Sequence, residues 1–173
     1  MRKPQGSYGP GDVRPIFFWN PKGANGWLSQ WEPSVFVDQV GHKFVTAEQY
    51  MMASKALLFE DYEALDVIMA SDNPKVAQRA GRKVRGFIEE VWNKHRIDIV
   101  VQGNVYKFSQ NERLKKFLLG TAKRSLIEAS PYDRIWGIGF KAADAFENEE
   151  LWGMNLLGNA IMEARRQVRS LDA

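Results

Sequence analysis

Apolar residues recur at helical spacing over most of the chain, and shorter strand-like runs flank these stretches. The expected helices cover residues 47–58, 61–70, 74–82, 87–106, 110–120 and 156–168. The expected strands lie at residues 14–19, 35–37, 42–45, 125–127 and 135–138. The pattern therefore predicts an α+β fold, a predominantly helical domain with a small β-sheet.

Several helix ends carry recognisable capping residues. Thr46 and Gln49 fit a capping box that starts a helix at residue 47, and residues 109–112 read as a second box. Asn73 followed by Pro74 reads as the cap and first residue of another helix. These signals predict where the helices begin more sharply than the apolar spacing alone.

The chain is expected to form one domain. Residues 1–13 are rich in glycine and proline and predict a flexible N-terminal arm, with a single domain over 14–173. A hydrophobic content of 45% in 173 residues is enough for one core. The beginning of the chain has no apolar signal core and no stretch resembles a membrane span, which favours a cytoplasmic protein without a membrane partner.

The amino-acid composition excludes several classes of catalytic and metal site. The chain has no cysteine and only two histidines, His42 and His95, which excludes thiol nucleophiles, thiolate metal sites and multi-histidine metal sites. Carboxylate-bound Mg²⁺ stays open, and neither a metal nor another cofactor is predicted. The net charge of +3 is too small to indicate a nucleic-acid partner by itself.

Aromatic residues are unusually frequent, with six Trp, five Tyr and ten Phe. Tryptophan is flat and amphipathic, so some of these rings suit a platform for a flat ligand. For Phe17, Phe87 and Phe117, burial in the core is the simpler expectation.

Glu48 and Lys55 fall on one face of the helix predicted at 47–58, seven residues apart. Taken alone, Glu48 is more simply a partner of the helix dipole, and Lys55 a side chain that reaches to water. The functional interpretation is a carboxylate and an amine facing one cleft. Burial would lower the pKa of Lys55 and make it a candidate nucleophile toward a ribose C1.

Two later segments suggest a ligand site. In the run from Glu128 to Gly139, Asp133 is a turn residue or a catalytic acid, and Trp136 a core residue or a pocket wall, while Gly137 permits close backbone approach. Before the last helix, Asn155 and Gly158 form either a phosphate-binding turn or an ordinary helix cap.

These clusters resemble the YbiA-like family, also called NADAR. The matching segments, in family order, are Trp27–Ser29, Thr46–Tyr50 with Lys55, Lys107–Asn111, Leu126–Asp133 with Trp136–Gly139, and Trp152–Gly158 with Arg165. One departure is Gln30, where the family has Asn after Leu-Ser. The resemblance spans residues 16–168 and implies a compact, helix-rich N-glycosidase.

The resemblance also implies roles for individual residues. Glu48 and Asp133 would share acid and base duties, and Lys55 would form an imine with the ribose. Trp136 would shape the pocket, and Trp92 would form part of its wall. Ser29, Gly137, Asn155, Gly158 and Arg165 complete the expected substrate-binding set.

The implied substrate is a small phosphorylated N-riboside of the riboflavin pathway or ADP-ribosylated guanine, the latter possibly in DNA. The alternative to an enzyme is a non-catalytic ADP-ribose or nucleic-acid binding module, compatible with aromatic residues interleaved with Lys and Arg. The trio Glu48, Lys55 and Asp133 argues against it, because pure binding does not need those groups. The sequence leaves the oligomeric state open.

Overall fold

The computed structural model describes residues 12–171. Its elements in chain order are β1 (Ile16–Phe18), the 3-10 helix η1 (Gly26–Leu28), β2 (Phe36–Val37), β3 (Lys43–Phe44), α1 (Ala47–Leu58), α2 (Tyr62–Met69), α3 (Pro74–Gly81), α4 (Glu89–Ser109), α5 (Glu112–Gly120), β4 (Leu126–Glu128), the 3-10 helix η2 (Phe146–Leu151) and α6 (Leu156–Leu171). The α+β class expected from the sequence is confirmed. The predicted arm over residues 1–13 falls outside the described residues except for Asp12 and Val13.

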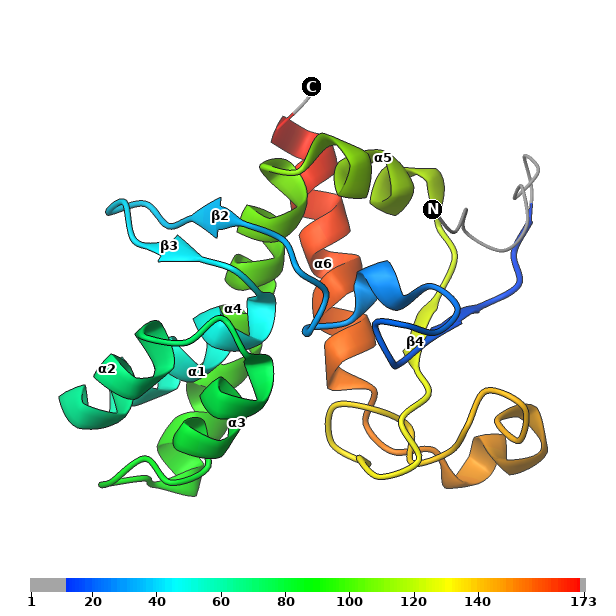
Figure 1. The fold of residues 1–173 in the computed structure, drawn as a ribbon. Helices are drawn as coiled ribbons and strands as arrows, with labels where there is room; N and C mark the ends of the chain where they lie inside the picture. The colour runs from blue at the N-terminus through cyan, green and yellow to red at the C-terminus, as the bar shows by residue number, and fades with distance from the viewer. Residues whose placement is uncertain (1–11, 172–173) are drawn as a thin grey trace.

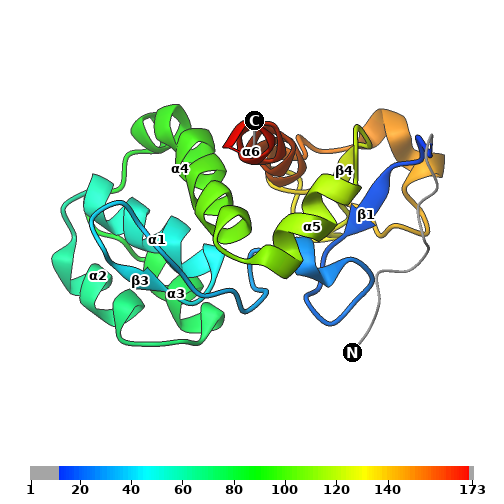
Figure 2. The same ribbon diagram turned by 90° about the horizontal axis from the view of Figure 1, so that it is seen from above.

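Helices α4 and α6 pack side by side in the middle of the molecule (Figures 1 and 2). On one side lie α1, α2, α3 and the β2–β3 hairpin, which we call the helical half. On the other side lie β1, β4 and the chain between β4 and α6, which we call the loop half. The two halves meet over α4 and α6, and the candidate site lies between them.

The helical half begins as the capping signals predict. The Thr46 hydroxyl accepts a hydrogen bond from the Gln49 amide at 3.1 Å, and α1 starts at the next residue. The Gln49 side chain accepts from the Val45 amide and donates to the carbonyls of Ile68 and Ser71 at the end of α2. One capping residue therefore ties α1 to the hairpin and to α2.

Helix α4 approaches α1 closely at a glycine. Gly103 of α4 faces the Tyr50 ring of α1, and a Cβ at Gly103 would lie 2.6 Å from Tyr50 Cδ1. On α6, Leu157, Ile161 and Val168 are buried, as the helical spacing predicts. Burial of such aliphatic side chains contributes roughly 1.5–3 kcal/mol each.

The loop half contains a short parallel sheet. β1 pairs with β4 in the register Ile16–Leu126 to Phe18–Glu128. The hairpin strands β2 and β3 form a separate antiparallel pair. The strand predicted near residues 125–127 and the hairpin are confirmed.

Three local predictions are wrong. Residues 135–138 form no strand, because the carbonyls of residues 134–138 accept hydrogen bonds from the amides of residues 153–157 at the start of α6. Ser109 ends α4 and does not cap α5, whose N-cap is Asn111; the Asn111 side chain instead donates to the carbonyls of Val35 and Lys107. Phe87 is 43% exposed and lies outside the core.

Candidate active site

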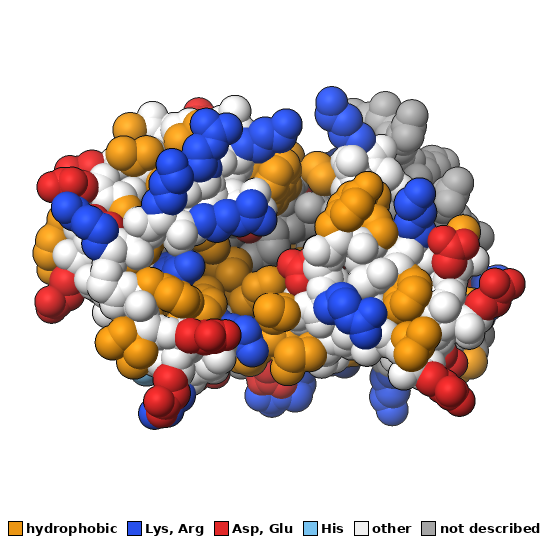
Figure 3. All heavy atoms as spheres, turned by 90° about the horizontal axis from the view of Figure 1, so that it is seen from below, with side chains coloured by type: hydrophobic (Ala, Val, Ile, Leu, Met, Phe, Trp, Pro, Cys, Tyr) orange, Lys and Arg blue, Asp and Glu red, His pale blue; other side chains and the backbone are white. Residues whose placement is uncertain are grey.

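A cleft of about 540 Å³ opens between the helical half and the loop half. Seen from below, the molecule is hollowed along this line (Figure 3). The lining side chains come from α1 and α3 of the helical half, from the loop half, from the two central helices and from residues 29–31. They are Trp19, Asn20, Pro21, Ser29, Gln30, Trp31, Glu48, Met51, Met52, Lys55, Gln78, Arg82, Trp92, Glu128, Ser130, Tyr132, Asp133, Trp136 and Leu157.

Glu48 lies in the first turn of α1 and is only 6% exposed. Its amide donates to the carbonyl of Gln30 at 3.0 Å. Burial raises the pKa of its carboxyl to about 7, an effect that the Asp133 carboxylate reinforces and that Arg82 and a hydrogen bond from the Trp31 side chain oppose. Near neutral pH, Glu48 therefore exists in both protonated and ionised forms.

Lys55 lies two turns further along α1 and also lines the cleft, as the shared helix face predicts. Its Nζ atom is 4.3 Å from the centre of the Phe87 ring and 5.4 Å from the Trp92 ring. Burial lowers the pKa of this amine, and the nearby Arg82 guanidinium lowers it further. A larger fraction of neutral amine is therefore present than for an exposed lysine.

Asp133 faces the cleft from the loop half. Its Oδ1 atom accepts hydrogen bonds from the amides of Ile135 and Trp136, both at 2.8 Å. This turn fixes the carboxylate beside the raised-pKa groups and also orients the Trp136 ring. The structural interpretation and the catalytic one are therefore compatible at this residue.

Glu128 is a site residue that the sequence reasoning missed. It ends β4, lines the cleft, and its Oε2 atom is buried without a hydrogen-bond partner among residues 12–171. Burial, together with the charges of Asp133 and Glu48, raises the pKa of its carboxyl to about 8. The sequence signal that could have identified Glu128 as a site residue is its place as a lone acidic residue at the carboxyl end of a short apolar strand.

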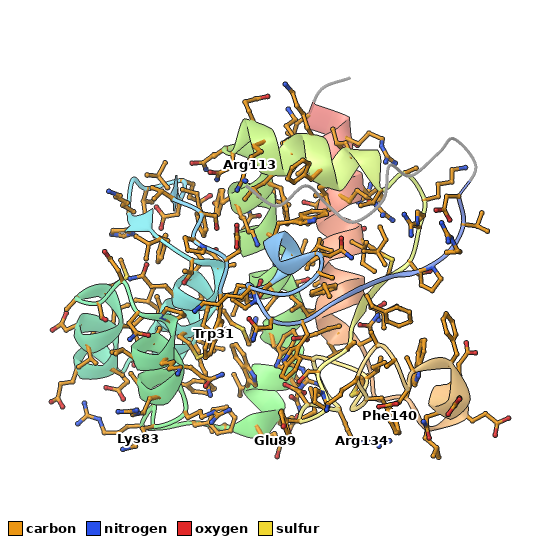
Figure 4. All side chains as sticks on the ribbon, turned by 45° about the vertical axis from the view of Figure 1, so that its right-hand side comes forward. Trp31, Lys83, Glu89, Arg113, Arg134 and Phe140 are labelled. Carbon is orange, nitrogen blue, oxygen red and sulfur yellow. The ribbon has the colours of Figure 1, made fainter. Side chains whose placement is uncertain are left out.

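Aromatic rings form much of the remaining wall. Trp92 and Trp136 line the cleft as expected. The sequence reasoning did not place Trp19, Trp31 or Tyr132 there, although Trp19 and Tyr132 form a ring pair 5.8 Å apart. Figure 4 shows Trp31 at the centre of the molecule, well inside the outer face marked by Lys83, Glu89 and Arg134.

Besides Glu128, the charged and polar lining residues outside the expected set are Asn20, Gln30, Gln78, Arg82 and Ser130. Arg82 directly follows α3 and is exposed, and its charge acts on both Glu48 and Lys55. No rule of local sequence assigns it to the site, because its position depends on how α3 packs against α1. Ser29, an expected residue, does line the cleft.

Three of the expected residues do not line the cleft but support the backbone of its wall. Asn155 has a positive φ of 49°; its side chain accepts from the Glu128 amide at 2.9 Å and donates to the Leu126 carbonyl at 3.0 Å. A Cβ at Gly158 would lie 2.1 Å from the same Leu126 carbonyl, and one at Gly137 would lie 2.8 Å from the Glu128 carbonyl. These residues therefore position β4 and Glu128.

Arg165 lies further along α6, away from the lining residues. Its guanidinium is buried and donates to the Thr121 hydroxyl at 2.7 Å and to the Arg124 carbonyl at 2.9 Å. These contacts join α6 to the turn after α5. The structure does not bring Arg165 together with the other expected site residues.

Within residues 12–171, no group of three or more His, Asp or Glu side chains is arranged to hold a metal ion. The described helices also include none that is long and apolar enough to cross a membrane.

Comparison of the sequence with known proteins identifies the family of this chain. The NADAR domain matches residues 17–169. The chain belongs to the NADAR family. N-glycosidase R617 of Acanthamoeba polyphaga mimivirus is 46% identical over 146 residues, which cover 81% of this chain and 86% of that protein. The N-glycosyl hydrolase class expected from the sequence is confirmed at this level of relationship.

Two further matches extend the comparison of this NADAR chain. The chloroplastic riboflavin biosynthesis protein PYRR of Zea mays is 33% identical over 140 residues, covering 76% of this chain and only 21% of PYRR. The NMR structure of the E. coli protein YbiA superposes with a TM-score of 0.76 at 24% identity, covering 98% of this chain and 94% of YbiA. That structure confirms the fold.

Proposed function

We propose that this chain hydrolyses the N-ribosyl bond of a phosphorylated or ADP-ribosylated nucleoside-type substrate in the cleft between its two halves. One observation carries the proposal. One aromatic-walled cleft is lined by four groups that suit this reaction. They are the carboxyl groups of Glu48 and Glu128, whose pKa values are raised, the carboxylate of Asp133, and the half-buried amine of Lys55.

Breaking a bond between ribose C1 and nitrogen develops positive charge on the sugar and negative charge on the leaving nitrogen. A carboxylate held by two amides, such as Asp133, stabilises the first charge without rearranging. The second charge needs a proton. Glu48, with a pKa of about 7, is an effective proton donor near neutral pH.

Lys55 is the proposed nucleophile. Its neutral amine attacks ribose C1 as the C1–nitrogen bond breaks, and the leaving nitrogen takes its proton from Glu48. Glu48, now ionised, takes one proton from the alkylated amine. The bond between C1 and the ring oxygen then breaks, the ring oxygen takes the remaining N–H proton, and an imine between Lys55 and C1 is left. Water adds to C1 of the imine while Asp133 takes its proton and passes it to the nitrogen, so that the C1–nitrogen bond breaks, the free sugar leaves and the Lys55 amine is restored.

The walls of the cleft suit a nucleoside-type ligand. Trp92, Trp136 and the Trp19–Tyr132 pair offer flat surfaces for a base, and a volume of about 540 Å³ accommodates a drug-sized molecule. Arg82 supplies a fixed positive charge for a phosphate at the rim. Both candidate substrates share this chemistry of a flat base, a ribose and a phosphate.

Two experiments test the proposal. The protein is incubated separately with ADP-ribosylated guanosine and with a phosphorylated N-riboside of the riboflavin pathway, and release of ADP-ribose or ribose 5-phosphate is measured. If the protein hydrolyses neither substrate, the proposed function is contradicted. Borohydride added during turnover should leave a covalent adduct on Lys55 in the wild type and none in Lys55→Met; an unmodified Lys55 would indicate direct attack by water.

A binding module is the alternative function, and one observation favours it. Exposed basic residues lie on α3 and directly after it, namely Lys75, Arg79, Arg82 and Lys83, of which Arg82 lines the cleft. Figure 3 shows Lys and Arg side chains beside the hollow. The trio Glu48, Lys55 and Asp133 inside the cleft disfavours it, because pure binding does not need these groups together. Steeply salt-dependent binding of single-stranded DNA by a protein that turns over neither substrate would support the module.

A further inference from the structure

Behind the floor of the cleft, two fully buried polar residues of α4 contact the segment that carries Trp31. Lys107 and Asn104 are each 0% exposed and lie three residues apart, on one face of the helix. Lysine is almost never fully buried without a partner. The proposed chemistry uses neither residue, so their burial calls for another explanation.

Each of the two residues reaches the segment 29–31. The Lys107 ammonium donates to the Ser29 carbonyl at 2.8 Å. The Asn104 amide donates to Gln30 Oε1 at 3.0 Å and to the Val100 carbonyl at 2.8 Å. More than 70 residues separate Ser29 and Gln30 from these residues of α4 along the chain, so α4 adds long-range support to a segment that also forms local turn hydrogen bonds.

The same segment then contacts Glu48 in two ways. The Gln30 carbonyl accepts from the Glu48 amide at 3.0 Å. The Trp31 side chain lies near enough to the Glu48 carboxyl to lower its pKa as a hydrogen-bond donor. The Ser29 hydroxyl accepts from the Trp31 amide at 3.2 Å, which holds the turn between them. A continuous set of contacts thus runs from α4 through residues 29–31 to the proposed proton donor.

We infer that Lys107 and Asn104 are positioning residues, which hold residues 29–31 against α1 so that Trp31 keeps its hydrogen bond to Glu48. Their effect on catalysis rests on the proposed function, in which Glu48 donates the proton. Neither residue touches the substrate in this scheme.

The electrostatics agree with this role. Burial lowers the pKa of Lys107 to about 7, and Glu32 opposes that change. The Trp31 hydrogen bond lowers the pKa of Glu48, as does Arg82, whereas burial and Asp133 raise it; Glu128 also faces Glu48. If Trp31 is released while the other groups stay in place, the pKa of Glu48 must rise.

The test is a carboxyl titration of the full chain by NMR with ¹³C-labelled glutamate, which needs no substrate. Glu48→Gln identifies the Glu48 signal. Trp31→Phe and Lys107→Met are each expected to raise its titration midpoint by about one pH unit, the scale of a hydrogen bond to a charged group. The double variant should shift it no further than either single variant, because both changes remove the same hydrogen bond.

The controls separate the possible failures. Lys94→Met, an exposed lysine on the same helix, should leave the midpoint unchanged. If Lys107→Met does not fold, Asn104→Leu carries the same expectation. A shift in Trp31→Phe with none in the folded α4 variants overturns the inference, as does no shift in any variant. Absence of turnover would contradict the proposed function and leave the titration result standing.

Discussion

The two walls of the cleft are built in different ways. On the helical half, Glu48 and Lys55 project from one regular helix, α1, whose start is fixed by a local cap. On the loop half, Glu128, Asp133 and Trp136 follow irregular backbone that is held by hydrogen bonds from the start of α6. The placement of Glu48 and Lys55 on one helix face depends on residues near one another in sequence, whereas the placement of the loop-wall residues depends on contacts across the fold.

This difference separates two kinds of mutational effect. A change at a functional group on α1 should remove chemistry and leave the structure intact, since the helix does not depend on that side chain. A change in the support of the loop half should lower stability and activity together. The predictions below run from the largest expected effect to the smallest.

Glu48→Gln is the sharpest test of the helical wall. Loss of the proton donor should lower kcat by about 10²- to 10⁴-fold, the usual contribution of general acid catalysis. Thermal unfolding should show no loss of stability, because a buried carboxyl with a raised pKa is replaced by a neutral amide of the same shape. Steady-state kinetics with the released sugar as readout measures the effect.

Glu89→Gln on α4 is the matched control, since Glu89 is exposed and lies outside the cleft lining. Full activity of a folded Glu48→Gln protein would remove Glu48 from the mechanism. It would leave Glu128 as the remaining carboxyl with a pKa raised above neutrality.

Asn155→Gly tests the support of the loop wall. Glycine keeps the positive φ of 49° without strain but loses the bonds to the Glu128 amide and the Leu126 carbonyl. The free energy of unfolding should fall by about 3 kcal/mol, because two buried backbone groups lose partners. Denaturant unfolding measures this, and kcat/KM should fall with it as Glu128 moves.

Asn159→Ala one turn later on α6 is the control, because Asn159 is exposed and makes only a 3.4 Å contact to the Met154 carbonyl. Unchanged stability in Asn155→Gly would show that the loop half is held by the backbone contacts of residues 134–138 alone.

The same contrast explains how far the sequence predicts the molecule. Glu48 and Lys55 were found because helix periodicity and the Thr46 cap act within a few residues. The strand expected at residues 135–138 was wrong because the donors that pair with its carbonyls lie at residues 153–157. Nothing in an apolar run of four residues indicates whether its partners belong to a sheet or to a helix start.

Glu128 and Arg165 show the same limit for the site. The raised pKa of Glu128 depends on burial and on Asp133 and Glu48, which the fold brings together from two other segments. Arg165 suits a phosphate by residue type, yet its guanidinium is occupied by Thr121 and Arg124. Residue type and spacing identify candidate chemistry, and packing decides which candidates share a cleft.

Glu128→Gln tests how much the buried Glu128 carboxyl, close to Asp133 and Glu48, lowers the free energy of unfolding when it ionises. The folded-state pKa of about 8 exceeds the ordinary 4.5, so the stability that Glu128 contributes is present below pH 4.5 and lost as pH rises through 8. Glutamine cannot ionise. The variant should therefore come close to the wild type at pH 5 and be more stable than the wild type at pH 9, because only the wild type then carries a buried ionised carboxyl.

Denaturant unfolding at the two pH values provides the measurement. Glu147→Gln on η2 serves as the control, since this glutamate is exposed and outside the cleft. A variant that is less stable than the wild type at pH 9 would show that Glu128 has an ionised partner in the folded protein.

Arg165→Met tests whether contacts further along α6 stabilise the fold without affecting substrate binding in the cleft. Methionine keeps much of the aliphatic packing and removes the bonds to the Thr121 hydroxyl and the Arg124 carbonyl, so the free energy of unfolding should fall by about 1–2 kcal/mol. KM should not change, because these contacts lie at the turn after α5 and not at the cleft. Arg79→Met, at an exposed arginine of α3, is the control. A tenfold rise in KM at unchanged stability would instead place Arg165 on the substrate phosphate, which requires the guanidinium to leave Thr121 when substrate binds.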